Sequence, residues 1–175
     1  MPRIREDHAH EQFFFSEGTC ARLVALASQY RRPLLLCTPS IAVALDAQSR
    51  PYILLDRDRR FAHLSGYQRF DLRAPHMIFE DFDAIFVDPP FSNISLEQLA
   101  GTVDALARCA PTQPDLYLCY INTREEELLR RFGMFSLRRH PGALGYRSVK
   151  ASTQARIFLY GPLIEGSPAR SSDRY

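Results

Sequence analysis

The chain has 175 residues, of which 46% are hydrophobic and 24% charged, and its formal net charge is +2. This length suits one domain, and the composition excludes a generally disordered chain. No apolar run approaches the ~18 residues that a membrane span requires, and residues 1–12 lack the apolar stretch of a secretory signal. We therefore expect no membrane partner.

Four scattered cysteines without a Cys-x-x-Cys pair argue against a zinc ribbon or a disulfide scaffold. They predict a reducing, cytoplasmic location and no metal site. The small net charge gives no overall electrostatic case for nucleic acid. Lys150 is the only lysine among 22 basic residues, a bias that a GC-rich genome explains.

Helical and strand patterns alternate along the chain. A helix is expected from Ser16, in an N-cap region, to Pro33, which closes it. The further expected elements are strand 34–37, helix 41–47, strand 52–55, strand 67–70, strand 84–87, helix 96–109, strand 116–121, helix 125–132, and a final pair of strands at 135–138 and 155–160. This alternation predicts an α/β fold with a mostly parallel, seven-stranded sheet and helices on both faces. Residues 12–162 form the domain, between a flexible N-terminus (1–11) and a flexible tail (163–175).

Three of the first four predicted strands end on an acid, namely Asp56, Asp71 and Asp88. In open parallel sheets, ligands bind beyond the carboxyl ends of the strands. Carboxylates at that edge favour a ligand rich in hydroxyl and amine groups. The alternative is that each aspartate forms a turn or caps a helix.

The strongest motif is Asp88-Pro89-Pro90-Phe91, directly after strand 84–87. Two prolines stiffen the backbone and remove two N–H donors, which leaves the Asp88 carboxylate and the Pro89 carbonyl as acceptors. Phe91 offers an aromatic face beside them. Adenine N6 fits this set, because two acceptors can hold its N–H hydrogens and favour an attacking tetrahedral nitrogen. Such a base has to be unpaired or flipped out. The alternative is a simple turn.

Together with four other segments, this motif resembles the class I S-adenosylmethionine-dependent methyltransferases of the N6-adenine type. The similarity spans residues 11–162 and points to the group of the zinc-knuckle ribosomal RNA adenine methyltransferase and the elongation-factor lysine methyltransferases. The other segments are an N-terminal aromatic motif at 12–16, a first-strand loop at 37–40, a second-strand acid at 54–61 and a last strand at 155–158. The resemblance implies a Rossmann-like methyltransferase core with S-adenosylmethionine as cofactor.

The resemblance also implies roles for single residues. Asp56 would hold the cofactor ribose, and Asp71 would lie near its adenine amine. The other cofactor-binding residues would be Gln12, Phe13, Phe15, Ser16, Thr38 and Pro39. Asp88, Pro89, Pro90 and Phe91 would hold the substrate amine. The first-strand loop has no glycine, which departs from most of the class but is shared by the named group, so we interpret it as a subtype.

A basic and aromatic segment from Arg124 to Tyr175 could contact RNA, with ten basic against five acidic residues. A solvated helix face and strand edge is an equal alternative. Residues 140–146 are expected to form a mobile loop beside the site, as a lid or a substrate contact. The predicted substrate-binding residues are Phe91, Tyr120, Arg138, His140, Tyr146 and Arg156.

By resemblance to the ribosomal RNA enzyme, adenine N6 in RNA is the predicted methyl acceptor. Three alternatives remain open: a protein lysine, a DNA adenine, and a catalytically degenerate nucleic-acid-binding module. The core already uses most of the chain, which leaves no room for a target-recognition domain. A protein partner, a homodimer or a structured substrate is therefore expected to supply target recognition.

Overall fold

The computed structural model describes residues 5–7 and 12–162. The predicted flexible ends, 1–11 and 163–175, lie outside these residues except for 5–7. The described chain forms one seven-stranded sheet in the order β3-β2-β1-β4-β5-β7-β6. Its strands are β1 (Pro33–Leu36), β2 (Ile53–Asp56), β3 (Tyr67–Arg69), β4 (Ala84–Val87), β5 (Asp115–Ile121), β6 (Arg138–Ala143) and β7 (Ile157–Gly161).

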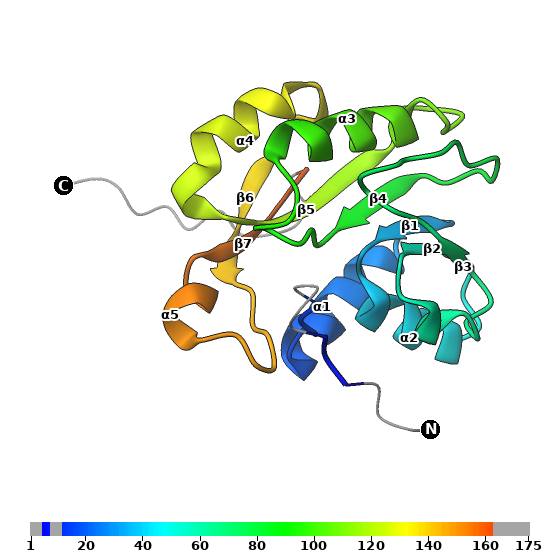
Figure 1. The fold of residues 1–175 in the computed structure, drawn as a ribbon, viewed down its shortest axis with the longest axis horizontal. Coiled ribbons are helices and arrows are strands. Elements are labelled where there is room, and N and C mark those ends of the chain that lie inside the picture. Colours follow the sequence, from blue (N-terminus) through cyan, green and yellow to red (C-terminus); the bar gives the residue numbers. More distant parts are fainter. Residues whose placement is uncertain (1–4, 8–11, 163–175) are drawn as a thin grey trace.

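The first five strands are parallel, and β7 runs antiparallel to both β5 and β6. Figure 1 shows α3 and α4 on one face of the sheet and α1 and α2 on the other. The helices are α1 (Glu17–Ala27), α2 (Pro39–Ala47), α3 (Leu96–Ala107), α4 (Glu125–Arg131) and α5 (Ala151–Gln154). The predicted mostly parallel sheet with helices on both faces is thus confirmed. No described helix has the length and apolarity to cross a membrane.

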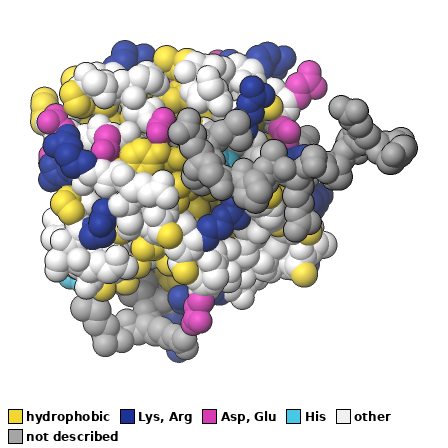
Figure 2. Space-filling model, turned by 180° about the vertical axis from the view of Figure 1, so that it is seen from behind, with side chains coloured by type: hydrophobic (Ala, Val, Ile, Leu, Met, Phe, Trp, Pro, Cys, Tyr) yellow, Lys and Arg dark blue, Asp and Glu magenta, His cyan; other side chains and the backbone are white. Residues whose placement is uncertain are grey.

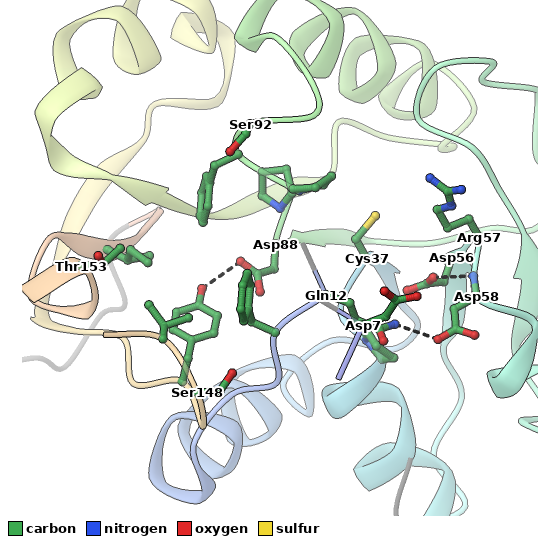
Figure 3. Close-up of a pocket in the computed structure, with 18 of the residues that line it drawn as sticks. Asp7, Gln12, Cys37, Asp56, Arg57, Asp58, Asp88, Ser92, Ser148 and Thr153 are labelled. Carbon is green, nitrogen blue, oxygen red and sulfur yellow. Dashed lines mark hydrogen bonds between the residues drawn. The ribbon is translucent and has the colours of Figure 1, made fainter. Parts of the chain in front are cut away.

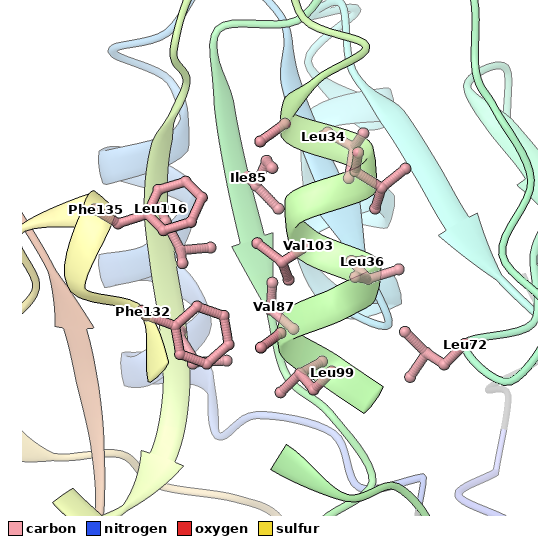
Figure 4. Packing of buried hydrophobic residues seen from close by; sticks show 14 of the residues in the cluster. Leu34, Leu36, Leu72, Ile85, Val87, Leu99, Val103, Leu116, Phe132 and Phe135 are labelled. Carbon is pink, nitrogen blue, oxygen red and sulfur yellow. The ribbon is translucent and has the colours of Figure 1, made fainter. Parts of the chain in front are cut away.

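The central strands are buried on both faces, which makes the sheet a rigid platform. Leu34 and Leu36 of β1 face α3, and Leu35 faces the α1 and α2 side. Figure 4 shows the first of these clusters, in which Leu99 and Val103 of α3 pack over the sheet. All four residues of β1 are buried, because helices cover both of its sides.

The first helix begins as predicted but ends earlier. The Ser16 hydroxyl accepts the Thr19 N–H and caps the N-terminus of α1. The prediction that Pro33 closes this helix was wrong, because α1 ends at Ala27 and Pro33 opens β1. The Asp83 carboxylate accepts the backbone N–H groups of residues 31 and 32, and these bonds lead the chain out of the helix into the strand.

The last strand pair and the loop between its two strands also differ from expectation. Residues 133–135 form a 3-10 helix, and β6 begins only at Arg138. Residues 140–143 belong to β6 and not to a loop, and the register with β7 shifts between the paired residues Arg139 and Ala143. Pro141, which has no N–H, and Gly142, with a φ of 81°, lie at that irregularity. Only residues 144–150 remain as the segment that leads to α5.

Candidate active site

A cavity of about 700 Å³ opens at the carboxyl edge of the parallel strands. It is lined by residues 56–59 at the end of β2, 88–92 after β4 and 148–150 before α5, together with Asp7, Gln12, Phe13, Cys37, Pro39, Ile121, Tyr146, Thr153 and Ile157. Figure 3 shows Asp56 and Asp88 on different strands, with Cys37 between them. Two of the three strand-ending acids therefore share one pocket.

Asp56, the last residue of β2, is 5% exposed. One of its carboxylate oxygens, Oδ1, accepts the Asp58 N–H at 2.8 Å. Burial raises the pKa of Asp56 to about 6, and the backbone hydrogen bond acts in the opposite direction. The backbone N–H of Arg57 also acts on this carboxylate and lowers its pKa, while the side chains of the described residues donate no hydrogen bond to it. A buried carboxylate without a side-chain donor is suited to accept hydrogen bonds from hydroxyl groups.

A polar network fastens the N-terminal segment to the loop after β2. The Asp58 carboxylate forms an ion pair with Arg60 at 2.6 Å and accepts the Gln12 side-chain amide at 2.9 Å. Arg60 also donates to the side-chain amide oxygen Oε1 of Gln12 at 2.7 Å. Burial acts to raise the pKa of Asp58, but the hydrogen bonds from Arg60 and Gln12 hold it below its ordinary value. Gln12 is thereby fixed at the pocket wall.

The segment before α5 pairs with the predicted aromatic motif at 12–16. The Ser16 N–H donates to the Gly145 carbonyl at 2.8 Å, and Phe15 forms a β-bridge with Tyr146. A Cβ at Gly145 would lie only 2.6 Å from the Ser16 hydroxyl oxygen, so this approach requires glycine. Phe13 reaches the pocket, whereas Phe15 is buried and packs its ring 5.1 Å from that of Tyr146. Phe15 and Ser16 thus support the pocket wall without lining it.

Asp88 lies directly after β4, and among the described residues its carboxylate has one side-chain hydrogen-bond partner. The Tyr146 hydroxyl donates to its Oδ1 at 2.8 Å (Figure 3). Burial raises the pKa of Asp88 to about 8, and the Tyr146 hydrogen bond acts to lower it. Tyr146 itself is fixed by Gln154, which accepts its N–H at 3.0 Å and donates to its carbonyl at 3.1 Å. This arrangement leaves Oδ2 of Asp88 for another donor.

The remainder of the predicted motif forms an aromatic and backbone wall. The Pro90 carbonyl accepts the Asn93 N–H at 3.2 Å, whereas the Pro89 carbonyl accepts no backbone N–H of the described residues. The Phe91 ring lies 5.5 Å from the Tyr120 ring in an edge-on arrangement. Tyr120 is 3% exposed and supports Phe91 from below without lining the cavity.

Several predicted site residues lie outside the cavity lining. Asp71 is exposed and accepts the Arg73 N–H, as a turn-forming aspartate does. Thr38 is buried before α2, with a hydroxyl that has no partner within the described chain. The predicted substrate contacts Arg138 and Arg156 are exposed away from the cavity, and Arg156 donates to the Ser152 carbonyl. His140 is buried, with Nε2 3.0 Å from the Pro162 carbonyl oxygen.

Other lining residues were not predicted. Arg57, Asp58 and Arg59 follow the β2 acid in sequence, so their position beside it could have marked them. Cys37 lies in the turn after β1 with a φ of 58°, a left-handed conformation that glycine usually supplies. Burial raises the pKa of its thiol well above the ordinary value, so the thiol stays protonated. Lys150 could have been noticed only because it is the one lysine of the chain.

Comparisons with known proteins agree with this geometry. The family model described as a probable N6-adenine methyltransferase matches residues 6–148. A search of curated proteins found no match.

Solved structures with the same fold include the N-methyltransferase NodS from Bradyrhizobium japonicum in complex with S-adenosylhomocysteine, at 12% identity, a TM-score of 0.60 and 91% coverage of both chains. A TehB-like SAM-dependent methyltransferase from Corynebacterium glutamicum aligns at 14% identity and a TM-score of 0.57, covering 82% of this chain and 85% of the other. The branched-chain polyamine synthase from Thermus thermophilus aligns at 13% identity and a TM-score of 0.61, over 92% and 60%. At these identities the likeness establishes the fold alone, which is the Rossmann-like fold of class I methyltransferases.

Proposed function

The chain belongs to the probable N6-adenine methyltransferase family, and from this premise we propose that it is an S-adenosylmethionine-dependent enzyme that methylates the N6 amine of adenine in RNA. One observation carries the proposal: Asp88-Pro89-Pro90-Phe91 and Asp56 line the same cavity at the carboxyl edge of the sheet. When bound, S-adenosylmethionine supplies an electrophilic methyl group.

The residues of the cavity suit this cofactor. Its volume of about 700 Å³ lies within the range of roughly 300–1,000 Å³ that is usual for ligand pockets. No described side chain donates to the Asp56 carboxylate, which can accept hydrogen bonds from ribose hydroxyls, and Phe13 and Pro39 supply apolar surface. The buried, unpartnered Thr38 hydroxyl adjoins the lining residues Cys37 and Pro39, so it could donate to a bound group. Two structural neighbours add support: NodS, solved with S-adenosylhomocysteine, and the SAM-dependent TehB-like methyltransferase.

The acceptor amine would be held by Asp88 and Pro89. In adenine, the N6 lone pair is delocalised into the ring, so the amine is a weak nucleophile. Ionised Asp88 can accept one N–H at Oδ2, while Tyr146 occupies Oδ1, and the Pro89 carbonyl can accept the other. These two acceptors favour a tetrahedral nitrogen whose lone pair is available. Asp88 can also take the proton that the nitrogen releases after methyl transfer, while Phe91 stacks on the ring.

The resemblance of the strand around 155–158 to the ribosomal RNA enzyme favours RNA over DNA. Because the cavity accommodates only an unpaired base, target selection would rest on a protein partner, a second copy of the chain or a structured substrate. All four cysteines are free thiols, which is compatible with the cytoplasmic location that we propose.

Two measurements test the proposal. A calorimetric titration with S-adenosylhomocysteine should give one site per chain, and labelled S-adenosylmethionine should then deliver its methyl group to an adenine-containing RNA. Asp88→Ala should abolish transfer and leave the affinity for S-adenosylhomocysteine within a few-fold. Full activity in that variant would refute the assigned site. Absence of any binding would favour a degenerate nucleic-acid-binding module, for which the glycine-free loop after β1 is the argument.

A protein lysine is the second candidate acceptor. The observation that favours it is the pKa of about 8 for Asp88, which makes this carboxylate a suitable base for a lysine ammonium group. A lysine has to lose a proton before it attacks, so its methylation rate should rise steeply with pH. A flat profile above neutrality with a lysine substrate would count against this alternative.

A further inference from the structure

The charges that line the cavity are sorted by depth. The acids are withdrawn from solvent: Asp56 is buried, and Asp7, Asp58 and Asp88 are partly buried. The cations, Arg57, Arg59 and Lys150, are all exposed. The cavity therefore has an acidic floor, formed by these aspartates, and a basic rim, formed by the three cations. The rim cations lie on two sides of the cavity, after β2 and before α5.

The floor and the rim also differ in how their charges are compensated. Asp58 is paired with Arg60, and Asp88 with the Tyr146 hydroxyl. In contrast, no rim cation forms a side-chain hydrogen bond or ion pair with another described residue. Figure 3 shows the Arg57 guanidinium turned away from both Asp56 and Asp58. The rim therefore carries positive charge that is available to an anionic ligand.

Two arginines of the basic segment in the C-terminal third are paired with acids. Arg139 pairs with Glu125 at 3.1 Å and lies over the Phe158 ring at 5.1 Å. Arg124 pairs with Glu127 at 2.9 Å. On the face shown in Figure 2, basic side chains are interspersed with acidic ones and do not form one broad field. Positive charge that is both uncompensated and next to the site is found at the rim.

We propose that Arg57, Arg59 and Lys150 bind the phosphates that flank the acceptor base and hold a single nucleic-acid strand across the mouth of the cavity. This inference rests on the proposed function and adds its mode of substrate recognition. A guanidinium binds a phosphate through two parallel N–H bonds, and an ammonium binds it as a point charge. The acidic floor repels phosphate, so the backbone stays at the rim while the uncharged base enters toward Asp88. The charge pattern alone thus orients a nucleotide with its amine inward.

The test measures how charge-matched variants bind a single-stranded RNA oligonucleotide that contains one adenine. Binding is monitored by fluorescence anisotropy over a range of salt concentrations. Arg57→Gln/Arg59→Gln should weaken binding by about tenfold per cation and reduce the slope of log K against log salt by about 1.4. Lys150→Gln should reduce the slope by about 0.7. The control is Arg31→Gln/Arg108→Gln, which removes the same charge from exposed residues before β1 and after α3, at the opposite edge of the sheet. It should bind RNA as the wild type does.

Four results would overturn the role proposed for the rim cations. An equal loss in the control variant would mean that only total charge matters. If the rim variants bind RNA as the wild type does, and the wild type methylates RNA, the rim cations do not bind the substrate. The proposed function is then unaffected. If the arginine variant loses affinity for S-adenosylhomocysteine to the same extent, those arginines bind the cofactor and not the RNA. Transfer by the wild type to protein lysine and not to RNA would refute the adenine assignment and the rim together.

Discussion

Tyr146→Phe removes one hydroxyl group and keeps the ring that packs against Phe15. The lost interaction is the 2.8 Å hydrogen bond to Oδ1 of Asp88. A hydrogen bond to a charged group contributes about 1.5–3 kcal/mol, and 1.36 kcal/mol corresponds to about one pH unit. We therefore expect the pKa of Asp88 to rise from about 8 by a further ~1–2 pH units. At pH 7 the ionised, accepting form would become roughly 10- to 100-fold rarer, and methyl transfer would slow by the same factor.

The assay is kcat/KM for methyl transfer to RNA between pH 6 and 9.5. The difference from the wild type should be largest below pH 8 and narrow as pH rises. Nuclear magnetic resonance titration of ¹³C-labelled Asp88 in the cofactor-free protein follows the same ionisation without relying on activity. Tyr160→Phe is the matched control, since that hydroxyl donates to the Glu125 carboxylate at 2.8 Å outside the cavity. An Asp88 midpoint that stays in place or moves downward in Tyr146→Phe would refute the reasoning.

Three further predictions follow from burial and close contacts. Because the pKa of Asp88 is raised to about 8, stability from its protonated form is lost as pH rises from about 4 to 8. Asp88→Asn should therefore be more stable than the wild type at pH 9, by up to ~5 kcal/mol, and similar at pH 4; equal Tm values at pH 9 would contradict this. Asp56→Ala should weaken S-adenosylhomocysteine binding about 10- to 100-fold in calorimetry. With a pKa of about 6 for Asp56, the affinity of the wild type for S-adenosylhomocysteine should rise between pH 5 and 7, whereas that of Asp56→Asn should not change with pH. A wild-type affinity that does not change with pH would show that Asp56 does not bind the ribose. Gly145→Ala should lower stability by about 1–3 kcal/mol through contact with Ser16, while Gly18→Ala, whose Cβ meets nothing within 4 Å, should not destabilise; equal Tm changes in both would contradict the close approach.

Local sequence determined the strands and the acids that end them. Short apolar runs mark strands buried on both faces, so β1, β2 and β4 lie within one residue of their predicted bounds. Asp56 and Asp88 reach the carboxyl edge because they directly follow those runs. The Ser16 cap is local in the same sense, since it acts within one helical turn. The end of α1 was missed because the Asp83 carboxylate, which redirects the chain, comes from a distant segment.

Only the tertiary structure determined what surrounds those acids. Tyr146 lies 58 residues from Asp88 in sequence, and it reaches that carboxylate because residues 145–147 pair with the N-terminal aromatic motif. The pairing of charges also depends on the tertiary structure. Arg139 has no acidic neighbour in sequence but forms an ion pair with Glu125, whereas Arg57 lies between two acids in sequence and forms an ion pair with neither. Residue patterns report burial and periodicity along the chain, which local chemistry dictates. The pKa of Asp88 and the charge at the cavity rim depend on which distant side chains meet, and packing of the whole domain decides that.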